Sequence, residues 1–527
     1  MSEQFIIILV AFVIYMGMMI LIGALNSKNA NNEDYFLGGR GLNSWTAALS
    51  AQASDMSGWL LMGLPGAIYL AGSGEMWIAI GLLIGTVLNW MLVARRLRKY
   101  TIVANNSLTI PSFFENRFHD KKGIMKIVAS IVIIVFFAVY TASAFTSGAK
   151  LFANVFGTGA NDKTAYMVGL IIAAVVILVY TLLGGFKAVC YTDFIQGMLM
   201  LVAILAVPIL AYFITIHGTD TNSVTGEMAK HGVADPAGFL SLFKNGDGSP
   251  ITWQSVVSGL GWGLGYFGMP HILVRFMAIK SDKEVKKSRV IAIVWVILSL
   301  GAACFLGLVA RGFLSTTLDG SNSETVFIKS ILQLFDGNFV LIFIGGIFLC
   351  GILAAIMSTA DSQLLVTASS VSEDMYKGVI KKNASEKSAL NVGRIAVVVT
   401  AVIAFLIALD PDSSVMKLVS DAWAGFGAAF GPVILLSLFW KRFNLTGAVS
   451  GMVTGFLSII IWDYIPFFNI PVEGGDPLTT IGAVTGVYSL VIGFVLAAVV
   501  AIIVTLVTKA PSKEITKEFD KVKTVEI

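Results

Sequence analysis

Residues 51–60 read AQASDMSGWL, and they interrupt an apolar stretch that starts near Thr46 and continues through LLMGLPGAIYL. The rest of the chain is also strongly apolar: 56% of its 527 residues are hydrophobic, 13% are charged, and the mean hydropathy is +0.84. This composition is typical of an integral membrane protein and lies outside the range of soluble chains. The polar segment Ser54–Gly58 therefore falls in the middle of a predicted membrane helix.

Thirteen apolar stretches are long enough to cross about 30 Å of hydrocarbon. The first lacks a basic leading segment and a cleavage site, so we interpret it as a retained helix and not as a signal peptide. The sequence thus predicts an all-α polytopic membrane protein with thirteen transmembrane helices. These helices are expected at residues 5–25, 46–70, 73–93, 124–155, 164–184, 190–216, 253–277, 288–311, 339–372, 391–409, 416–440, 445–466 and 483–508.

Lysine and arginine gather in alternate connections between these helices. They are frequent after the first, third, fifth, seventh, ninth and eleventh helices and in the C-terminal tail, whereas the other connections hold few. Since cytoplasmic loops carry the excess of positive charge, we expect an external N-terminus and a cytoplasmic C-terminus. The protein is predicted to be a multi-pass protein of the cell (plasma or inner) membrane.

Residue patterns typical of enzymes are not found. Cys190, Cys304 and Cys350 all lie in apolar stretches, and the four histidines form no metal-binding pair. The chain shows no nucleophile–base set and no cofactor motif. We therefore expect a protein that is not an enzyme, without an organic cofactor, a nucleic-acid partner or an obligate protein partner.

The seventh helix is also predicted to be irregular. Residues 255–276 read SVVSGLGWGLGYFGMPHILVRF, and their five glycines and Pro270 weaken a regular helix. This helix comes five helices after the interrupted second one. If helices 2–6 and 7–11 are two copies of one unit, the odd unit length inserts the second copy upside down, which predicts the 5+5 inverted repeat of LeuT-type transporters. Close packing between helices is an alternative explanation for the glycines.

This organisation predicts five parts of the chain. They are residues 1–45 (first helix and the cytoplasmic loop leading into the second), 46–216 (first repeat), 253–466 (second repeat), 467–508 (last helix) and 509–527 (cytoplasmic tail).

A carboxylate at the centre of a membrane helix costs about 2.5–3.5 kcal/mol on the insertion scale. Asp55 therefore needs a cation, a hydrogen-bonding partner or water nearby. The unwound backbone around it also needs partners, because lipid offers none. A small cation bound by the freed carbonyl oxygens would satisfy both requirements, so the interruption indicates half of an ion site.

The ninth helix is a candidate for the other half of the ion site. Ala355, Ser358, Thr359 and Ser362 recur at positions i, i+3, i+4 and i+7, and so they share one helix face. Hydroxyl oxygens suit a hard cation. Alternatively, such serines and threonines bond back to the carbonyl four residues earlier or bridge neighbouring helices.

Four long motifs resemble the solute/sodium symporter family, and specifically its sodium/proline branch. They are RGLNSWTAALSAQASDMSGWLLMGLPG at 40–66, GGFKAVCYTDFIQG at 184–197, GWGLGYFGMPHILVRFMAI at 261–279 and AAIMSTADSQLLVTASSVSEDMYK at 354–377. The resemblance covers nearly the whole chain. It implies a secondary active transporter that couples inward sodium movement to L-proline uptake by alternating access.

The resemblance implies a main sodium site at the second and ninth helices. The implied ligands are the backbone oxygens of Ala53, Met56 and Ala355 and the side-chain oxygens of Ser358 and Thr359. It also implies coupling roles for Asp55 at the interruption and for Arg40 at the cytoplasmic entrance to the second helix. An ordinary positive-inside anchor is the alternative for Arg40.

Proline is a zwitterion with an apolar ring. Amide N–H groups near Ser57, Gly58 and Trp59 are expected to meet its carboxylate at the positive end of a half-helix. An aromatic wall suits its ammonium group and ring, and the resemblance points to Tyr140, Trp262, Tyr266 and Pro270. Taken singly, these aromatics are also explained by packing or by an interfacial position.

A second cation site is implied at Asp193, Asp361 and Ser362, next to Ser358. Family members with a second sodium have a hydroxyl where this chain has Asp361, and the sequence leaves open whether Asp361 binds a cation, carries a proton or forms a salt bridge. The predicted partners are therefore L-proline, sodium and the lipid bilayer. A sodium-coupled symporter of another amino acid or small carboxylate, or a proton-coupled variant, is the alternative function.

Overall fold

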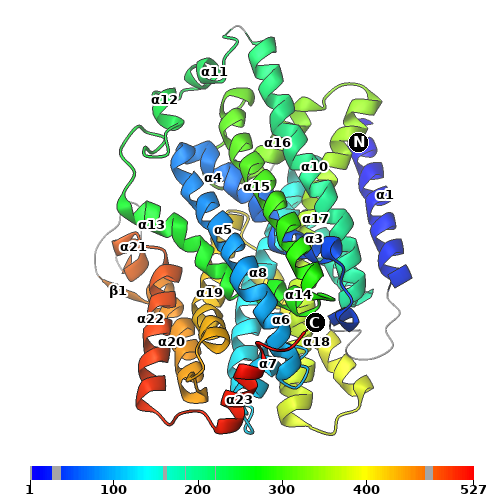
Figure 1. The fold of residues 1–527 in the computed structure, drawn as a ribbon. Coiled ribbons are helices and arrows are strands. Elements are labelled where there is room, and N and C mark those ends of the chain that lie inside the picture. Colours follow the sequence, from blue (N-terminus) through cyan, green and yellow to red (C-terminus); the bar gives the residue numbers. More distant parts are fainter. Residues whose placement is uncertain are drawn as a thin grey trace.

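The computed structural model describes residues 3–26, 37–157, 163–183, 185–219, 221–468 and 479–526. Residues 27–36 of the predicted loop leading into the second helix, and residues 469–478 of the predicted last part, lie outside the described residues. The described chain is almost entirely helical (Figure 1).

Helices occupy all thirteen predicted stretches in the described part of the chain. In ten of the stretches, one long α-helix covers most of the predicted residues. These are α1 (Glu3–Asn26), α8 (Ile124–Phe156), α9 (Lys163–Leu183), α10 (Phe186–Gly218), α15 (Asp282–Phe313), α17 (Phe339–Ser369), α18 (Glu386–Ile407), α19 (Val415–Phe439), α20 (Leu445–Tyr464) and α22 (Ser489–Val507).

The other three membrane stretches are each divided. The second consists of α3 (Ser44–Asp55), η2 (Trp59–Gly63) and α4 (Leu64–Ala71); the third of α5 (Met76–Leu88), η4 (Asn89–Val93) and α6 (Ala94–Val103); and the seventh of α13 (Trp253–Gly261), η5 (Trp262–Phe267) and α14 (Pro270–Met277). Eleven helical runs of the described chain are long and apolar enough to cross a membrane. The second and seventh stretches do not form separate runs by that measure, because they are interrupted.

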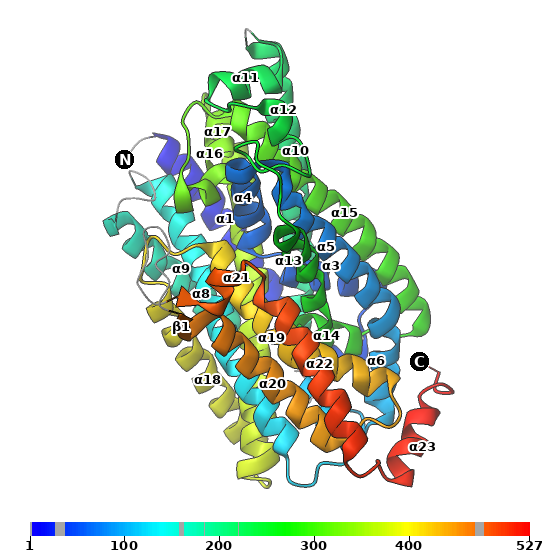
Figure 2. The same cartoon turned by 90° about the vertical axis from the view of Figure 1, so that its left-hand side faces the viewer.

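Short elements connect the long helices. They are η1 (Gly38–Arg40), η3 (Gly72–Glu75), α7 (Ile110–Phe118), α11 (Val224–Lys230), α12 (Pro236–Phe239), η6 (Gly320–Thr325), α16 (Val326–Leu334), η7 (Ser370–Ile380), α21 (Ile481–Thr485), α23 (Lys513–Lys521) and an antiparallel pair of strands, β1 (Pro466–Phe468) and β2 (Thr479–Thr480). The N-terminus lies toward the end that carries α11 and α12, and α23 lies at the opposite end in both views (Figures 1 and 2).

The outer helices expose apolar side chains, as membrane-facing helices do. Val13 of α1, Ile395 of α18 and Val507 of α22 are 63%, 62% and 77% exposed. Such a surface would promote aggregation in water, but lipid solvates it. By contrast, α3, most of α17 and most of α19 are buried in the interior.

Both predicted interruptions are confirmed. In the second stretch, α3 ends at Asp55 and Met56 takes non-helical φ and ψ angles of −87° and 81°. In the seventh, the chain tightens into the 3-10 helix η5 and restarts at Pro270, the first residue of α14. Proline suits this position because its missing N–H would have no helical partner there.

The glycines of the seventh stretch also allow close packing. A Cβ atom added to Gly85 of α5 would lie 2.2 Å from the Gly263 carbonyl oxygen, and one added to Gly265 would lie 2.0 Å from the Trp423 indole nitrogen. Such contacts are too short for any side chain. Close helix packing, which the sequence left open as an alternative, therefore applies to these glycines. The interruption is present as well, so both explanations are correct.

The C-terminal helix α23 docks onto the body of the protein. Phe519 is buried, and the guanidinium groups of Arg96 and Arg117 lie 5.1 and 5.4 Å from its ring centre. His119 pairs with Glu518 at 2.9 Å. Lys441 pairs with Asp520, and its ammonium group holds the pKa of that carboxyl below its usual range. The predicted tail is thus a packed element against α6 and α7.

Candidate ion and substrate site

Hydroxyl groups of α17 meet the end of α3. Ser358 Oγ donates to the Ala53 carbonyl oxygen at 2.8 Å, and Thr359 Oγ1 donates to the same oxygen at 3.4 Å. Ala53 lies within the last turn of α3, whose carbonyls lose their helical partners because the helix stops at Asp55. Carbonyl and hydroxyl oxygens therefore converge at the negative end of a half-helix, where a hard cation is favoured.

The remaining residues predicted to bind sodium lie at the same junction. Ser358 Oγ also contacts the carbonyl oxygens of Ala354 (2.8 Å) and Ala355 (3.3 Å). The bond to Ala354 is the i−4 bond that the sequence left open as an alternative. Met56 caps the C-terminus of α3 directly beside Asp55.

Asp55 connects the two interrupted stretches. Its Oδ2 accepts a hydrogen bond from the Tyr266 hydroxyl at 2.7 Å, and its backbone oxygen accepts from Trp59 Nε1 at 3.0 Å and from the Tyr140 hydroxyl at 3.3 Å. The side chain is fully buried, and its Oδ1 has no hydrogen-bond partner within the described part of the chain. One carboxylate oxygen thus remains able to accept from a ligand.

The backbone expected to meet a carboxylate is partly used by the protein itself. The Ser57 N–H donates to the Asp55 carbonyl at 3.1 Å, and the Trp59 N–H approaches Ser57 Oγ at 3.5 Å. A Cβ atom at Gly58 would lie 2.2 Å from Ser147 Oγ of α8. The turn at Ser57–Trp59 therefore packs tightly against α8.

The aromatic residues predicted for the pocket divide into two groups. Tyr140 and Tyr266 both contact Asp55. The Trp262 ring instead stacks on Tyr488 with ring centres 5.2 Å apart. Trp423 of α19, which the sequence did not predict, connects the two groups. Its indole N–H donates to the Trp262 carbonyl oxygen at 2.8 Å. Its ring lies edge-on to the Tyr266 ring, with ring centres 5.0 Å apart. A tryptophan in an apolar helix carries no sequence signal for this role.

A buried charge cluster occupies the predicted second cation site. Asp193 Oδ2 accepts from Ser50 Oγ at 2.7 Å and from Arg275 Nη2 at 3.1 Å. The same Arg275 nitrogen donates to Ser362 Oγ at 2.5 Å, and Ser362 Oγ lies 3.3 Å from Asp361 Oδ1. All these side chains are buried. Four helices (α3, α10, α14 and α17) therefore meet around one guanidinium group.

Arg275 lies in the family-like motif at 261–279, and the sequence pattern alone predicts no role for it. An arginine inside a predicted membrane helix could have indicated a functional position, because charged residues are rare there. It also lies 5.2 Å from the centre of the Phe186 ring. Within the described chain, Asp193 Oδ1 and Asp361 Oδ2 have no hydrogen-bond partner. Two acceptor oxygens thus remain beside the guanidinium group.

Arg40 is buried among backbone carbonyls. It donates to the carbonyl oxygens of Met277 (2.9 Å) and Ser107 (2.7 Å) and to Thr101 Oγ1 (3.1 Å). It also has a positive φ of 51°, which is uncommon for a residue with a side chain. These contacts tie α6 to the end of α14 and favour an internal role over an exposed positive-inside anchor.

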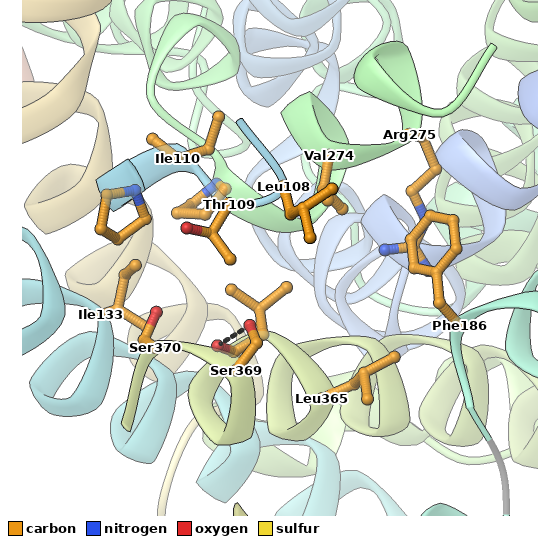
Figure 3. A pocket seen from close by; sticks show the side chains of 13 residues that line it. Leu108, Thr109, Ile110, Ile133, Phe186, Val274, Arg275, Leu365, Ser369 and Ser370 are labelled. Carbon is orange, nitrogen blue, oxygen red and sulfur yellow. Dashed lines mark hydrogen bonds between the residues drawn. The ribbon is translucent and has the colours of Figure 1, made fainter. Parts of the chain in front are cut away.

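The two ends of the protein differ in access to this site. A pocket, which we call the gate pocket, lies at the end that carries α7. It is lined by Pro270, Val274, Arg275, Thr109, Ser369 and Ser370 among others (Figure 3). At the other end, Glu324 of η6 accepts from Lys150 Nζ at 2.6 Å and from the first amides of α19, Val415 and Met416, at 2.9 Å. The loop carrying η6 thus closes against the helices on that side.

Comparison with known proteins agrees with the resemblance. The model of the sodium:solute symporter family matches residues 35–455. A protein named sodium/proline symporter 2, from Staphylococcus saprophyticus, is 42% identical over 522 residues, which cover 98% of this chain and 96% of the relative. The sodium/proline symporter of Haemophilus influenzae is 46% identical over 460 residues, covering 86% and 88%.

Two solved structures share the fold. A sodium-coupled sialic acid symporter superposes with a TM-score of 0.72 at 20% identity, covering 96% of this chain and 98% of its own. MhsT in complex with L-phenylalanine gives a TM-score of 0.53 at 14% identity, covering 91% and 99%. The predicted LeuT-type fold class is therefore confirmed. The chain belongs to the sodium:solute symporter family.

Proposed function

We propose that this protein couples inward sodium movement to L-proline uptake by alternating access. Family membership and relatives named sodium/proline symporters support this function. The observation that carries it is the junction of α3 and α17, where two hydroxyls converge on the Ala53 carbonyl oxygen at the break beside Asp55. Sodium bound there would order the interrupted second stretch and complete the adjacent substrate pocket.

The proposed sodium ligands are the backbone oxygens of Ala53, Met56 and Ala355 with the hydroxyls of Ser358 and Thr359. The short distances between Ser358 and the carbonyls of Ala53 and Ala355 support this set. In the sodium-bound state, each hydroxyl would turn its lone pairs toward the ion. Its O–H group would still donate a hydrogen bond to a neighbouring carbonyl oxygen.

Proline is proposed to bind between the two interrupted stretches. Its ring and ammonium group would face Tyr140 and Tyr266, and the unpaired Oδ1 of Asp55 offers an acceptor for the ammonium protons. Ser57, Gly58 and Trp59 would hold the carboxylate, and Trp262 and Pro270 would complete the wall around the ring. Pro270 also lines the gate pocket, which places an opening beside this wall.

A second cation is proposed beside Asp193, Asp361 and Ser362. The unpaired oxygens of the two carboxylates support it, and Arg275 limits it, because the guanidinium group already takes one oxygen of Asp193. The number of sodium ions transported with each proline can be measured from the highest proline accumulation that the protein reaches. With ~100 mV of membrane potential and a roughly tenfold sodium gradient, one sodium sustains about 500-fold accumulation of proline, and two would square that limit.

We also propose an external N-terminus, a cytoplasmic C-terminus and two repeats at 46–216 and 253–466. The arrangement of lysine and arginine and the opposite positions of the N-terminus and α23 support this orientation. The gate pocket would then open toward the cytoplasm. The Lys150–Glu324 contact would close the external side.

Uptake into proteoliposomes tests the proposed function. We expect labelled L-proline to accumulate when an inward sodium gradient and a negative interior potential are imposed, and not with potassium alone. Unlabelled proline should compete with the label. Equal uptake under a proton gradient without sodium would indicate the proton-coupled alternative, and stronger competition by another amino acid or small carboxylate would indicate a different solute.

Removal of either proposed hydroxyl ligand should weaken sodium binding. We expect Ser358→Ala and Thr359→Ala each to raise the sodium concentration for half-maximal uptake severalfold, because the ion loses one of its oxygen ligands. Apparent proline affinity should fall at low sodium and recover at saturating sodium, since the two binding events are linked reciprocally. Sodium titrations of initial uptake rates measure both effects. Unchanged sodium dependence in both variants would contradict the site.

A further inference from the structure

A second cavity lies on the membrane-facing side of the protein and shares one lining residue, Leu365, with the gate pocket. It is a shallow depression between α9, α17 and α18, and its apolar walls include Leu182, Leu365, Ala368, Leu390 and Val397. We call it the α18 groove. No residue proposed to bind sodium or proline lines it.

The α18 groove opens onto the lipid-facing surface. Leu182 and Leu390 on its walls are 38% and 36% exposed, and Ile395 and Val398 beside it belong to the exposed apolar face of α18. Leu182 lies in the last turn of α9 and Leu390 in the second turn of α18. The groove is therefore located near one end of the membrane helices, at the level where headgroups meet acyl chains.

Arg394 lines the α18 groove and is exposed. It makes no hydrogen bond or ion pair with any other described residue. It stands on α18 among exposed apolar side chains that begin at Leu390 and extend to Leu406. At the headgroup level an anionic headgroup can pair with this charge, and a guanidinium group matches the geometry of a phosphate with two parallel hydrogen bonds.

Two further polar residues fit a phospholipid. Thr181 also lines the groove, and its hydroxyl is buried without a partner in the described chain, so it can donate to an ester carbonyl. Lys387 is exposed on α18, seven residues before Arg394 and hence on the same face, nearer the helix end. It adds positive charge on the side where a headgroup would extend.

We propose that the α18 groove binds an anionic glycerophospholipid. The phosphate pairs with Arg394, and one acyl chain occupies the apolar groove. Free phosphate would contact only the polar part of the groove, because five of its nine lining residues are apolar. The site adjoins the transport route: Leu365 of α17 lines both the α18 groove and the gate pocket. A lipid bound there therefore contacts the helix that carries Ser358 and Thr359.

Lipid-dependent thermal unfolding of the full chain in a neutral detergent tests this site. Phosphatidylglycerol should raise the unfolding temperature of the parent protein by several degrees, because a ligand that binds only the folded state stabilises it. Phosphatidylcholine and inorganic phosphate should not. Arg394→Gln should lower the apparent affinity for phosphatidylglycerol by about tenfold, as expected for the loss of one charge-assisted contact.

Three further variants separate the groove from general surface charge. Arg394→Lys, which keeps the positive charge but loses the two parallel hydrogen bonds, should have an affinity for phosphatidylglycerol between those of the parent and Arg394→Gln. Leu390→Trp, which fills the groove from its exposed wall and keeps the arginine, should lose it, and its unfolding temperature without lipid should match the parent. Arg289→Gln, at the start of α15 and away from the groove, should behave like the parent. An equal response to both lipids, a response to inorganic phosphate, or a full response in Arg394→Gln would overturn the proposal.

Discussion

Asp55→Asn is expected to reduce sodium-driven proline uptake on the order of 100-fold, and saturating sodium should not restore it. Asparagine keeps the size of the side chain and an acceptor for the Tyr266 hydroxyl, which bonds Asp55 at 2.7 Å. Among the residues that the structure describes, it removes the one full negative charge at the junction of the two interrupted stretches. A loss of about 3 kcal/mol of buried charge stabilisation corresponds to that factor.

The contrast with the hydroxyl variants makes this result specific. Ser358→Ala and Thr359→Ala should recover at high sodium, whereas Asp55→Asn should not. Asp336→Asn, a charge removal at an exposed position of the loop before α17, serves as the matched control and should retain parent activity. Sodium titrations of initial uptake rates compare all four variants. If high sodium restores Asp55→Asn fully, Asp55 acts no differently from a single neutral ligand.

Arg275→Gln is expected to destabilise the protein by about 3–5 kcal/mol and to abolish uptake. The change leaves the buried Asp193 carboxylate with Ser50 as its only hydrogen-bond donor in the described chain, and breaking a buried ion pair from one side carries that cost. The Ser362 hydroxyl, 2.5 Å from the guanidinium group, also loses its donor. Thermal unfolding in detergent measures the loss of stability.

The double variant Arg275→Gln/Asp193→Asn distinguishes charge pairing from simple packing. Removing the unpaired carboxylate should recover more than half of the lost stability, because contacting residues have coupling energies of up to about 3 kcal/mol. Arg95→Gln breaks the half-exposed pair with Asp282 and should cost at most about 1 kcal/mol. Additive losses in the double variant would show that the two side chains act independently.

Much of the candidate site was predictable because its signals are local. Asp55 stands out since a carboxylate is costly in an apolar helix, and the face shared by Ser358 and Thr359 follows from helical spacing. Pro270 and the glycines before it indicated the second interruption. In each case, the unusual residue and the pattern that makes it unusual lie within one stretch of chain.

Other functional contacts join segments that are distant in sequence. Arg275 meets Asp193 across 82 positions, and Trp423 meets Trp262 across 161. Glu324 caps α19 from a loop about 90 positions earlier. None of these pairs has a periodicity or a motif that links its members, so only the packed helices bring them together.

The sequence by itself determined the membrane medium, the positions of the helical stretches, the two interruptions and the hydroxyl face of the ninth helix. These features depend on the transfer of each residue into hydrocarbon and on helical geometry, which act residue by residue. Only the tertiary structure decided that Arg275 occupies the predicted second cation site, that Trp262 faces Tyr488 and that α23 packs against the body. Those outcomes depend on which helices become neighbours, because a buried charge or ring is stabilised by whatever the adjacent helix presents.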